Sequence, residues 1–586
     1  MAGESLEYRC KITELKRKSW MQSVRNANVT ERTTQWNCVN WRKVNKVVRR
    51  LRLRIFKATR SGKLKLVRNL QRLLMRSYSN ILISVRRVTQ INQGKNTPGV
   101  DKLVIKTPAA RGLLVDILTK FIPWKPYPTR RVYIPKANGK KRPLGIPSII
   151  DRCLQAIVKN ALEPYWESKF EGSSYGFRPG RSAHDAIGKI YNIARPNKTK
   201  KWVVDADIKG CFDNIAHEPL IKIIGNFPAR KLINLWLKAG YVDKGTFYET
   251  ETGTPQGGII SPLLANIALH GLEKALGIKH NNRGELTGKR AIVRYADDFV
   301  VFCETKEDAE KSVTILNKWM KDRGLALSDE KTKIVHLTQG FDFLGFNVRQ
   351  YPVSNTLTGF KLLIKPSKQT MQNVRNKIRY VWLENKSQSV DYLVDKLNPI
   401  IRGIANYLRI GVSTEAFSSL DHWMYIRERR YTKRMHPNKS DKWREKRYWG
   451  RLNLDRMDNW VFGDKASNKH LLKFNWFNIK RHTLVKGTSS PDDPELRQYW
   501  VEREKSKSQT LEPSNQKIAK KQDYLCPVCH ESLFNGETLH RHHITPRHQN
   551  GKNNLANLQL VHYYCHQQIH SNHTKHSSQS EEVLIW

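Results

Sequence analysis

The first 95 residues of the chain combine aliphatic side chains at helical spacing with a dense set of cations. Between Arg42 and Arg54, valines and leucines are interleaved with arginines and lysines, and no acidic residue lies among them. The pattern predicts basic helices. The polar face of such a helix is either solvated or in contact with nucleic acid, and the unmatched cations favour nucleic acid.

From 130 to 345 the pattern changes to short β-rich runs separated by helical segments. The runs at 202–208 and 292–295 consist mainly of β-branched and other apolar residues, whereas 151–164 and 305–323 have helical spacing. This alternation is typical of an α+β domain.

The pattern of the C-terminal part is helical at first and then irregular. Residues 367–434 have the spacing of three helices, and we expect one of them to begin with Asn398 as N-cap and Pro399 as first helical residue. The stretch 435–487 is rich in tryptophan and cations, which either stack on nucleic-acid bases or form a small core. The run Gly-Thr-Ser-Ser-Pro at 487–491 predicts a linker.

The overall charge indicates the kind of partner. The chain has 104 Lys and Arg against 52 Asp and Glu, a formal net charge of +52. Nucleic acid is the natural partner for such an excess, because each neutralised phosphate releases counterions. A membrane surface is the alternative, but the charge is spread along the whole chain. No stretch approaches the roughly 18 apolar residues of a membrane span, and the N-terminus resembles no secretory signal, so we expect no membrane and a cytoplasmic protein.

Two adjacent acids lie between β-forming residues, which predicts a hairpin with Asp297 and Asp298 at its turn. Adjacent carboxylates repel each other, so they either balance the basic surface or bind a cation. Asp207 ends another β-rich run. Three carboxylates at neighbouring strand ends could hold two Mg²⁺ ions about 3.5–4 Å apart, one for an attacking hydroxyl and one for a leaving pyrophosphate.

A second group of candidate ligands lies near the C-terminus. Cys526 and Cys529 are three residues apart, and His562 and Cys565 repeat this spacing. Two such pairs suit tetrahedral Zn²⁺. A redox role is the alternative, but no thioredoxin-like pattern surrounds the pair. The other five of the eight cysteines have no ligand spacing, and we expect reduced thiols.

Several runs along the chain resemble, in order, the motifs of reverse transcriptases. Tyr-Ala-Asp-Asp at 295–298 resembles the catalytic motif of the palm, and 207–213 resembles the catalytic-aspartate motif before it. The other runs lie at 131–136, 140–147, 175–182, 254–263 and 343–346. The order of all these runs is far more specific than any one of them.

The resemblance is more precisely to group II intron-encoded proteins. Residues 96–101 resemble their extra N-terminal motif, with Lys102 where the family usually has Gly, and 402–408 resemble their maturase helix. The resemblance implies a multidomain α+β fold: a right-hand polymerase with fingers and palm, a helical thumb and a C-terminal ββα-metal HNH domain. The implied domains are a basic helical N-terminal extension at 1–95, reverse-transcriptase fingers and palm at 96–350, maturase (thumb) helices at 360–437, a DNA-binding region and linker at 438–515, and an HNH endonuclease with a zinc site at 516–586.

The resemblance also implies the roles of single residues in the polymerase. Asp207, Asp297 and Asp298 would hold the Mg²⁺ ions. The implied nucleotide-binding residues are Lys136, Arg142, Phe212 and Gln256. The two cations would grip the triphosphate, and the glutamine would touch nucleotide or template. The phenylalanine would exclude a ribose 2′-hydroxyl, unless it is an ordinary core residue.

Interleaved with the Cys/His pairs are residues that resemble the HNH nuclease motif. The resemblance implies that His542, His566 and His570 bind a catalytic divalent ion. His543 would be the general base, and Asn557 would orient it. The alternative is a zinc ribbon that binds DNA without cutting it. We expect this segment to have a core separate from that of the palm.

These features together imply a multifunctional protein of intron mobility. It would be an RNA-directed DNA polymerase, a maturase that assists intron splicing, and a DNA endonuclease whose cut primes the copying of intron RNA. The implied partners are intron RNA, target DNA and deoxynucleoside triphosphates, and a homodimer is left open. Two alternatives remain: an RNA-binding splicing factor without polymerase activity, and a reverse transcriptase of a defence or retron system.

Overall fold

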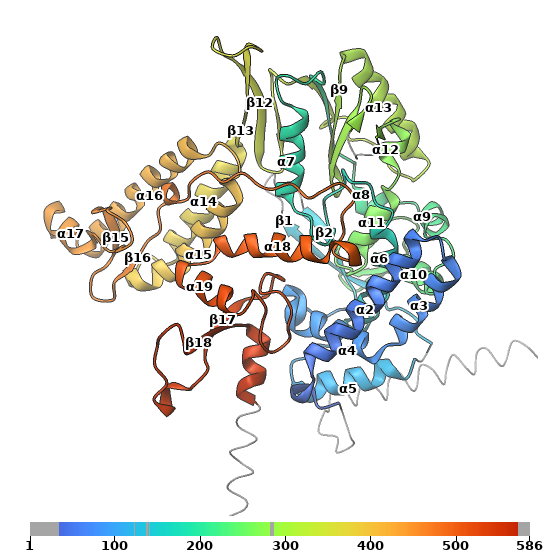
Figure 1. The fold of residues 1–586 in the computed structure, drawn as a ribbon, viewed down its shortest axis with the longest axis horizontal. Coiled ribbons are helices and arrows are strands. Elements are labelled where there is room, and N and C mark those ends of the chain that lie inside the picture. Colours follow the sequence, from blue (N-terminus) through green and yellow to red (C-terminus); the bar gives the residue numbers. More distant parts are fainter. Residues whose placement is uncertain (1–33, 122, 136–138, 140, 282–285, 572–586) are drawn as a thin grey trace, which may run out of the picture.

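The computed structural model describes residues 34–121, 123–135, 139, 141–281 and 286–571. An N-terminal layer of helices is followed by a mixed α and β region, a group of long helices and a small C-terminal segment (Figure 1). None of the described helices has the length and apolar character needed to cross a membrane.

The N-terminal layer contains the basic helix predicted between Arg42 and Arg54. Its helices are α2 (Trp41–Arg60), α3 (Leu64–Arg76), α4 (Tyr78–Arg86), α5 (Pro108–Thr119) and α6 (Ile149–Glu167). The side chain of Asn40 caps α2 by accepting a hydrogen bond from the backbone N–H of Lys43. An unpaired N–H at the helix start is thereby satisfied.

The cations of α2 find acidic partners far along the chain. Arg52 contacts the carboxylates of Glu163 at 2.9 Å and Asp492 at 2.6 Å, and Arg60 contacts that of Asp493 at 2.8 Å. The expectation of unmatched cations between Arg42 and Arg54 is therefore wrong for Arg52, and also for Arg49, which pairs with Glu531 at 3.3 Å. Their acids come from other elements, which local sequence does not reveal.

The palm is a four-stranded antiparallel sheet with strand order β10–β3–β9–β8. Its strands and flanking helices are β3 (Trp202–Ala206), β8 (Ala291–Tyr295), β9 (Asp298–Cys303), β10 (Lys333–His336), α7 (Ala183–Ile193), α11 (Ser261–Ala268) and α13 (Lys306–Lys321). Alternate side chains enter two different cores. Val204 and Val301 pack in the core that contains α11 and α13, whereas Val203 and Val300 pack in the core that contains α7. The sheet is therefore buried on both faces, and only its ends are available for chemistry.

A second sheet carries the fingers hairpin, in the strand order β2–β1–β4–β5. Its strands are β1 (Thr129–Pro135), β2 (Lys141–Ile146), β4 (Tyr241–Asp243) and β5 (Thr246–Tyr248). The pairing of β1 with β2 confirms the hairpin expected from the motifs at 131–147.

A three-stranded sheet leads from the palm into three long helices. These elements are β11 (Phe341–Phe343), β12 (Phe346–Pro352), β13 (Phe360–Pro366), α14 (Lys368–Glu384), α15 (Val390–Leu408) and α16 (Thr414–Met435). The three helices predicted for 367–434 are confirmed. A helix start at Asn398 is wrong, because α15 begins at Val390 with Ser389 as N-cap, and Pro399 lies inside it. The Asn398 side chain instead bonds to the backbone of 470–472, at 2.9 Å in both contacts.

The tryptophan-rich stretch contributes to a packed core. It contains α17 (Asp441–Tyr448), β14 (Trp449–Gly450), β15 (Val461–Asp464) and β16 (Lys469–His470). Trp449 is buried and stacks on Trp460 with ring centroids 5.8 Å apart. Trp443 and Trp460 keep exposed surface, so the stretch is part core and part accessible face.

The segment at 487–491 is not a free linker. Arg181 of the palm donates hydrogen bonds to the carbonyl oxygens of Gly487 at 2.7 Å and Ser489 at 3.2 Å. Ser490 is fully buried and accepts a hydrogen bond from the indole N–H of Trp500. The small residues that resemble a linker allow close packing against the palm instead.

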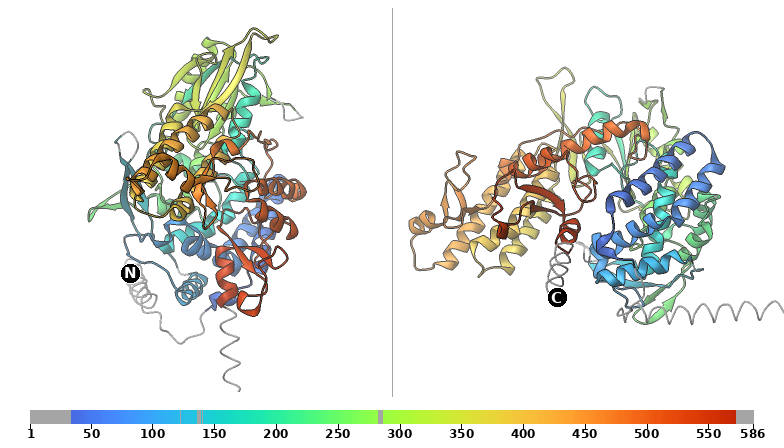
Figure 2. Two further views of the ribbon diagram at one scale, coloured as in Figure 1. Left: turned by 90° about the vertical axis from the view of Figure 1, so that its left-hand side faces the viewer. Right: turned by 60° about the horizontal axis from the view of Figure 1, so that its bottom comes forward.

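The C-terminal segment has the strand–strand–helix order expected for a ββα domain. Its elements are α18 (Arg497–Lys507), α19 (Pro513–Lys521), β17 (Leu539–His543), β18 (Leu558–His562) and a helix over 563–571. β17 and β18 pair antiparallel. Figure 2 shows this segment beside the N-terminal helices.

The core of this segment continues into the N-terminal layer. Cys526, Cys529 and Cys565 belong to one apolar cluster with Trp41 of α2 and Val85 of α4. This cluster is distinct from the two that hold the palm sheet. The segment is nevertheless not independent of the reverse transcriptase, because residues of α2, α4, α5 and α6 belong to the same core.

Glu428 of α16 generates a prediction about stability. Its carboxylate is buried and accepts a hydrogen bond from the Trp449 indole at 3.2 Å. Burial raises the pKa of Glu428 from 4.5 to about 8. The native state therefore resists ionisation, and its stability falls as pH rises from about 4.5 to about 8.

We expect Glu428→Gln, which keeps the acceptor but cannot ionise, to stabilise the protein at pH 8 by at least about 1 kcal/mol and to have little effect at pH 5. Thermal unfolding at both pH values tests this. Glu415→Gln on the same helix is the control, because that side chain is 86% exposed. An equal effect of Glu428→Gln at both pH values would contradict the assignment.

Candidate active sites

The three palm carboxylates gather at one end of the sheet. Asp207 directly follows β3, and Asp298 is the first residue of β9. The two strands are antiparallel neighbours, with Ala206 opposite Phe299. Asp297 lies in the turn between β8 and β9, after Ala296 at φ +60°. The predicted hairpin with two acids at its turn is confirmed.

Burial and mutual repulsion act on these acids. Burial, reinforced by the charges of Asp297 and Asp207, raises the pKa of Asp298 to about 6. Burial also raises the pKa of Asp297. The Nζ of Lys331 lies 2.7 Å from the Asp207 carboxylate. Partly buried carboxylates of like charge, with one already holding an ammonium group, fit a site for cations.

Asp205 is the fourth acid of this region. Burial first, and then the charge of Asp298, raises its pKa to about 6. It lies within β3, opposite Val300 of β9. It therefore belongs to the electrostatic surroundings of the strand ends, although Asp207 alone follows the strand.

The buried side chain of Arg294 supports the turn between β8 and β9. Local sequence did not reveal this role. Arg294 is 1% exposed and donates hydrogen bonds to the Asn266 side chain at 3.0 Å and to the carbonyl of Ala296 at 3.1 Å. Asn266 donates in turn to the carbonyl of Gly176 at 2.9 Å. The only signal in the sequence is an arginine in an otherwise apolar β-strand.

Of the four expected nucleotide-binding residues, Arg142, Phe212 and Gln256 lie in the part of the chain that the structure describes. Arg142 on β2 pairs with Ile134 of β1, and its charge lowers the pKa values of Asp297 and Asp298 against the effect of burial. Lys136 lies outside the described residues. The fingers hairpin therefore brings one of the two expected cations within electrostatic reach of the carboxylates.

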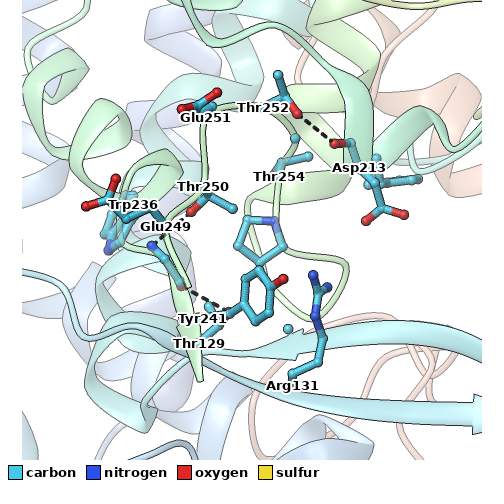
Figure 3. A pocket seen from close by; sticks show the side chains of 15 residues that line it. Thr129, Arg131, Asp213, Trp236, Tyr241, Glu249, Thr250, Glu251, Thr252 and Thr254 are labelled. Atoms are coloured by element: carbon cyan, nitrogen blue, oxygen red, sulfur yellow. Dashed lines mark hydrogen bonds between the residues drawn. The ribbon is translucent and has the colours of Figure 1, made fainter. Parts of the chain in front are cut away.

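Phe212 and Asp213 line a cavity of about 220 Å³ between the palm and the fingers sheet (Figure 3). The Phe212 ring meets that of Phe177 edge-on, with centroids 6.3 Å apart, and also packs against the palm core. Gln256 lies 3.5 Å from the Asp213 carboxylate. Phe212 is thus both a core residue and part of a cavity wall.

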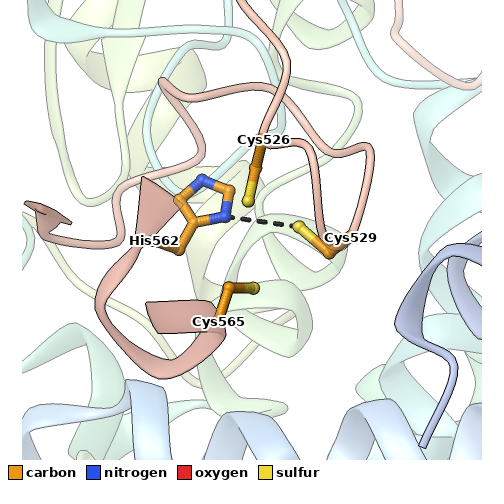
Figure 4. A group of neighbouring side chains, drawn as sticks. All are labelled: Cys526, Cys529, His562 and Cys565. Carbon is orange, nitrogen blue, oxygen red and sulfur yellow. Dashed lines mark hydrogen bonds between the residues drawn. The ribbon is translucent and has the colours of Figure 1, made fainter. Parts of the chain in front are cut away.

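The first Cys/His group is compact and buried. Cys526, Cys529, His562 and Cys565 each offer one donor atom, and all four atoms lie within 4.8 Å of one another (Figure 4). The Nε2 of His562 lies 3.1 Å from the carbonyl oxygen of Ser532, so this nitrogen carries the proton. Nδ1 is left to face the sulfur atoms, 3.3 Å from that of Cys529. This donor set fits a tetrahedral metal ion.

The second group consists of His542, His566 and His570, whose donor atoms also lie within 4.8 Å of one another. His542 comes from β17, and the other two lie one turn apart on the last helix, with their Nε2 atoms 3.2 Å apart. A strand and a helix therefore present three imidazoles to one point. Such a set fits a divalent ion with open coordination positions.

His543 lies beside this group and contacts two residues that the sequence did not reveal. Its Nε2 is 3.2 Å from the side-chain oxygen of Asn553 and 3.3 Å from Nε of Arg547. The hydrogen bonds of the Asn557 side chain go to other residues than His543. Asn557 instead bonds to both the backbone N–H and carbonyl of Thr545, so it closes the loop that follows His543.

Four protein families match consecutive parts of the chain. They are described as the N-terminal domain of reverse transcriptase (36–118), reverse transcriptase (RNA-dependent DNA polymerase) (134–348), the maturase-specific domain of group II introns (371–449) and HNH endonuclease (526–572).

Curated relatives agree with these matches. Protein YkfC of Escherichia coli is 39% identical over an alignment of 305 residues, and the match covers 45% of this chain and 79% of that protein. Group II intron-encoded protein LtrA of Lactococcus lactis is 31% identical over 426 residues, 58% of this chain and 69% of LtrA. A protein in the cob intron of Schizosaccharomyces pombe is 30% identical over 400 residues, 54% of this chain and 48% of that protein.

The fold and the matched domains define a multidomain reverse transcriptase with a maturase domain and an HNH endonuclease domain. The chain belongs to the family of group II intron-encoded proteins. Intron RNA and other nucleic acids are therefore its partners, and its two enzymatic domains use divalent metal ions.

Gly176 generates a prediction about the palm turn. A Cβ atom on this residue would lie 2.3 Å from the backbone nitrogen of Ala296. Gly176→Ala should therefore displace the turn that carries Asp297, and a displacement of about 1 Å can cost roughly 10²-fold in rate. Primer extension on an RNA template measures the loss. Gly188→Ala is the control, because its Cβ would lie no nearer than 3.7 Å to the Leu484 side chain, an ordinary van der Waals contact.

Proposed function

We propose that this protein assists the splicing of its intron RNA and then copies that RNA into DNA from a primer made at the target site. The observation that carries the proposal is that Asp207, Asp297 and Asp298 are all present and gathered, on a chain that also has a complete HNH donor set. A splicing factor that had lost polymerase activity would have no need of these carboxylates. The maturase and HNH domains argue against a defence or retron system.

The domain boundaries of this proposal follow the expectations from sequence. They are an N-terminal extension (1–95), fingers and palm (96–350), thumb (360–437), a DNA-binding region (438–515) and the endonuclease (516–586). The partly exposed Trp443 and Trp460 support base stacking in the fourth region. The reactions require a compartment that holds both intron RNA and target DNA, and a homodimer remains a prediction.

In the proposed polymerase site, Asp207, Asp297 and Asp298 hold two Mg²⁺ ions. When bound, these ions supply the charge that stabilises the transferring phosphoryl group. Lys331 neutralises part of the carboxylate charge, because its ammonium group pairs with the carboxylate of Asp207. Arg294 holds the turn in place by donating a hydrogen bond to the Ala296 carbonyl. The chain thus pre-organises both the charge and the backbone of the site.

The incoming substrate is proposed to be a deoxynucleoside triphosphate. Arg142 and Lys136 grip its phosphates from the fingers, where Arg142 acts as a bidentate fork. Phe212 stands against the sugar and excludes a 2′-hydroxyl, and Gln256 contacts the nucleotide or the template. The support is the place of Phe212 in the wall of the cavity next to Asp213.

In the proposed endonuclease, His543 takes a proton from the attacking water, and His542, His566 and His570 hold the divalent ion. Asn553 contacts His543 and orients its ring, whereas Asn557 acts indirectly by closing the loop. Cys526, Cys529, His562 and Cys565 hold Zn²⁺ as a structural ion. The burial of all four supports a structural rather than a catalytic site.

The polymerase assignment predicts that Asp297→Asn with Asp298→Asn lowers cDNA synthesis by at least about 10³-fold, because charge stabilisation by metal is worth several kcal/mol. Binding to intron RNA should remain almost unchanged, since the basic surface is kept. Primer extension and RNA binding measure the two effects. Asp342→Asn, an exposed acid of β11, is the control. Normal extension by the double variant would exclude the proposed metal ligands.

The nuclease assignment predicts that His543→Ala lowers second-strand cleavage by about 10²–10⁴-fold while the fold survives, because a general base but no metal ligand is lost. Cleavage of the DNA target and limited proteolysis, measured together, test this. His548→Ala is the control, because His548 is an exposed histidine of the same loop. If His543→Ala cleaves normally, the DNA-binding ribbon replaces the nuclease.

A further inference from the structure

The Cys526–Cys565 cluster lies where the nuclease segment meets the reverse transcriptase. Three of its ligands share an apolar core with Trp41 of α2 and with Val85 of α4. The four donor residues are between 0% and 2% exposed. A metal cluster that stabilised only the nuclease segment would be packed only against residues of that segment. This one is covered on one side by helices more than 400 positions away in the sequence.

Arg86, the last residue of α4, reaches directly into the cluster. Its guanidinium lies 3.4 Å from the sulfur of Cys565 and 3.2 Å from the carboxylate of Glu537, and it stacks over the Trp41 ring at 4.5 Å. The residue is only 6% exposed. An arginine of the reverse-transcriptase helices thus makes an N–H···S contact to a proposed metal ligand of the nuclease segment.

The residues next to the ligands make the other contacts across the boundary. The Tyr564 hydroxyl donates to the carbonyl of Gln90 at 2.5 Å. The Gln568 side chain donates to the carbonyls of Asn37 and Val39 at 2.8 and 3.0 Å. The loops and helix that supply metal ligands are therefore also the surface that contacts the N-terminal layer.

The charges explain why an arginine is needed there. Three thiolates, a neutral imidazole and Zn²⁺ carry a net charge of about −1, which is costly to bury without a cation. Glu537 adds a further negative charge beside it, and Arg86 faces both. Outer-shell groups of this kind typically change metal affinity by about 10–100-fold.

We propose that the Cys526–Cys565 cluster is a joint that fixes the nuclease on the reverse transcriptase, with Arg86 as the positioning residue that couples metal retention to docking. The proposal rests on the zinc assignment made above. Because coupling is reciprocal, docking on α4 slows metal loss, and metal loss weakens the protection of α4. The endonuclease is thereby held in one orientation relative to the polymerase that uses its cut.

The first experiment measures zinc transfer from the full-length protein to a chromophoric chelator. Arg86→Gln is expected to release zinc about 10–100-fold faster than the wild type. Arg86→Lys keeps the charge and should restore part of the difference. Arg49→Gln is the matched control and should leave the release rate nearly unchanged, because the pair of Arg49 with Glu531 crosses the same boundary but is 57% exposed at Arg49, where an ion pair contributes little to docking, and Arg49 does not contact a thiolate. Equal release rates for Arg86→Gln and the control overturn the proposal.

The second experiment tests whether docking itself slows zinc loss, or whether Arg86 acts only through its contact with the Cys565 sulfur. Gln568→Ala removes a contact to the N-terminal segment without touching the cluster, and should also speed zinc release. In the wild type, removal of zinc should increase amide hydrogen exchange in α4 but not in α13, which lies in the palm core. Unchanged exchange in α4 overturns the coupling. A wild-type protein that holds no zinc instead overturns the zinc assignment itself, and the proposal with it.

Discussion

Repulsion among three carboxylates at one end of the palm sheet is the constraint on which the polymerase site depends. Burial and neighbouring charge raise the pKa of Asp298 to about 6, so the ionised form is costly in the folded chain. Neighbouring basic side chains offset part of that cost. Lys331 pairs with Asp207, Arg142 acts from the fingers, and Arg294 holds the backbone of the turn. Divalent cations would relieve the rest, which is the physical basis of the proposed metal site.

The chain as a whole has the opposite imbalance, because its acids are scarce. Acidic residues are outnumbered by basic ones, 52 to 104, and several of the buried acids join distant segments. Asp185 of α7 accepts from His482 and Arg503, and Asp492 binds Arg52 of α2. These pairs hold the segment after the thumb against the palm and the N-terminal helices. Because cations outnumber acids two to one, many cations remain available for nucleic acid.

The sequence by itself determined the order of the domains and pointed to the candidate ligands of each site. The hairpin at 295–298 and the Cys526–Cys565 donor set follow from spacing within short segments, where local periodicity and ligand geometry decide the outcome. The set of His542, His566 and His570 and the ββα order were instead implied by the resemblance to the HNH motif. The same local reasoning placed a helix start at Asn398, and this prediction was wrong. It also interpreted 487–491 as a linker, because small polar residues suit both a free loop and a tightly packed one.

Only the tertiary structure decided how these parts support one another. Arg86 and Cys565 are 479 positions apart, and no spacing rule relates them. Arg294 is visible in the sequence as an arginine in an apolar strand, but its partner Asn266 comes from another element. Asn398 lies inside α15, and its side chain is bound to the backbone near 470 instead of capping a helix. In each case a polar side chain is satisfied by a group that chain folding, rather than local sequence, brings within hydrogen-bonding distance.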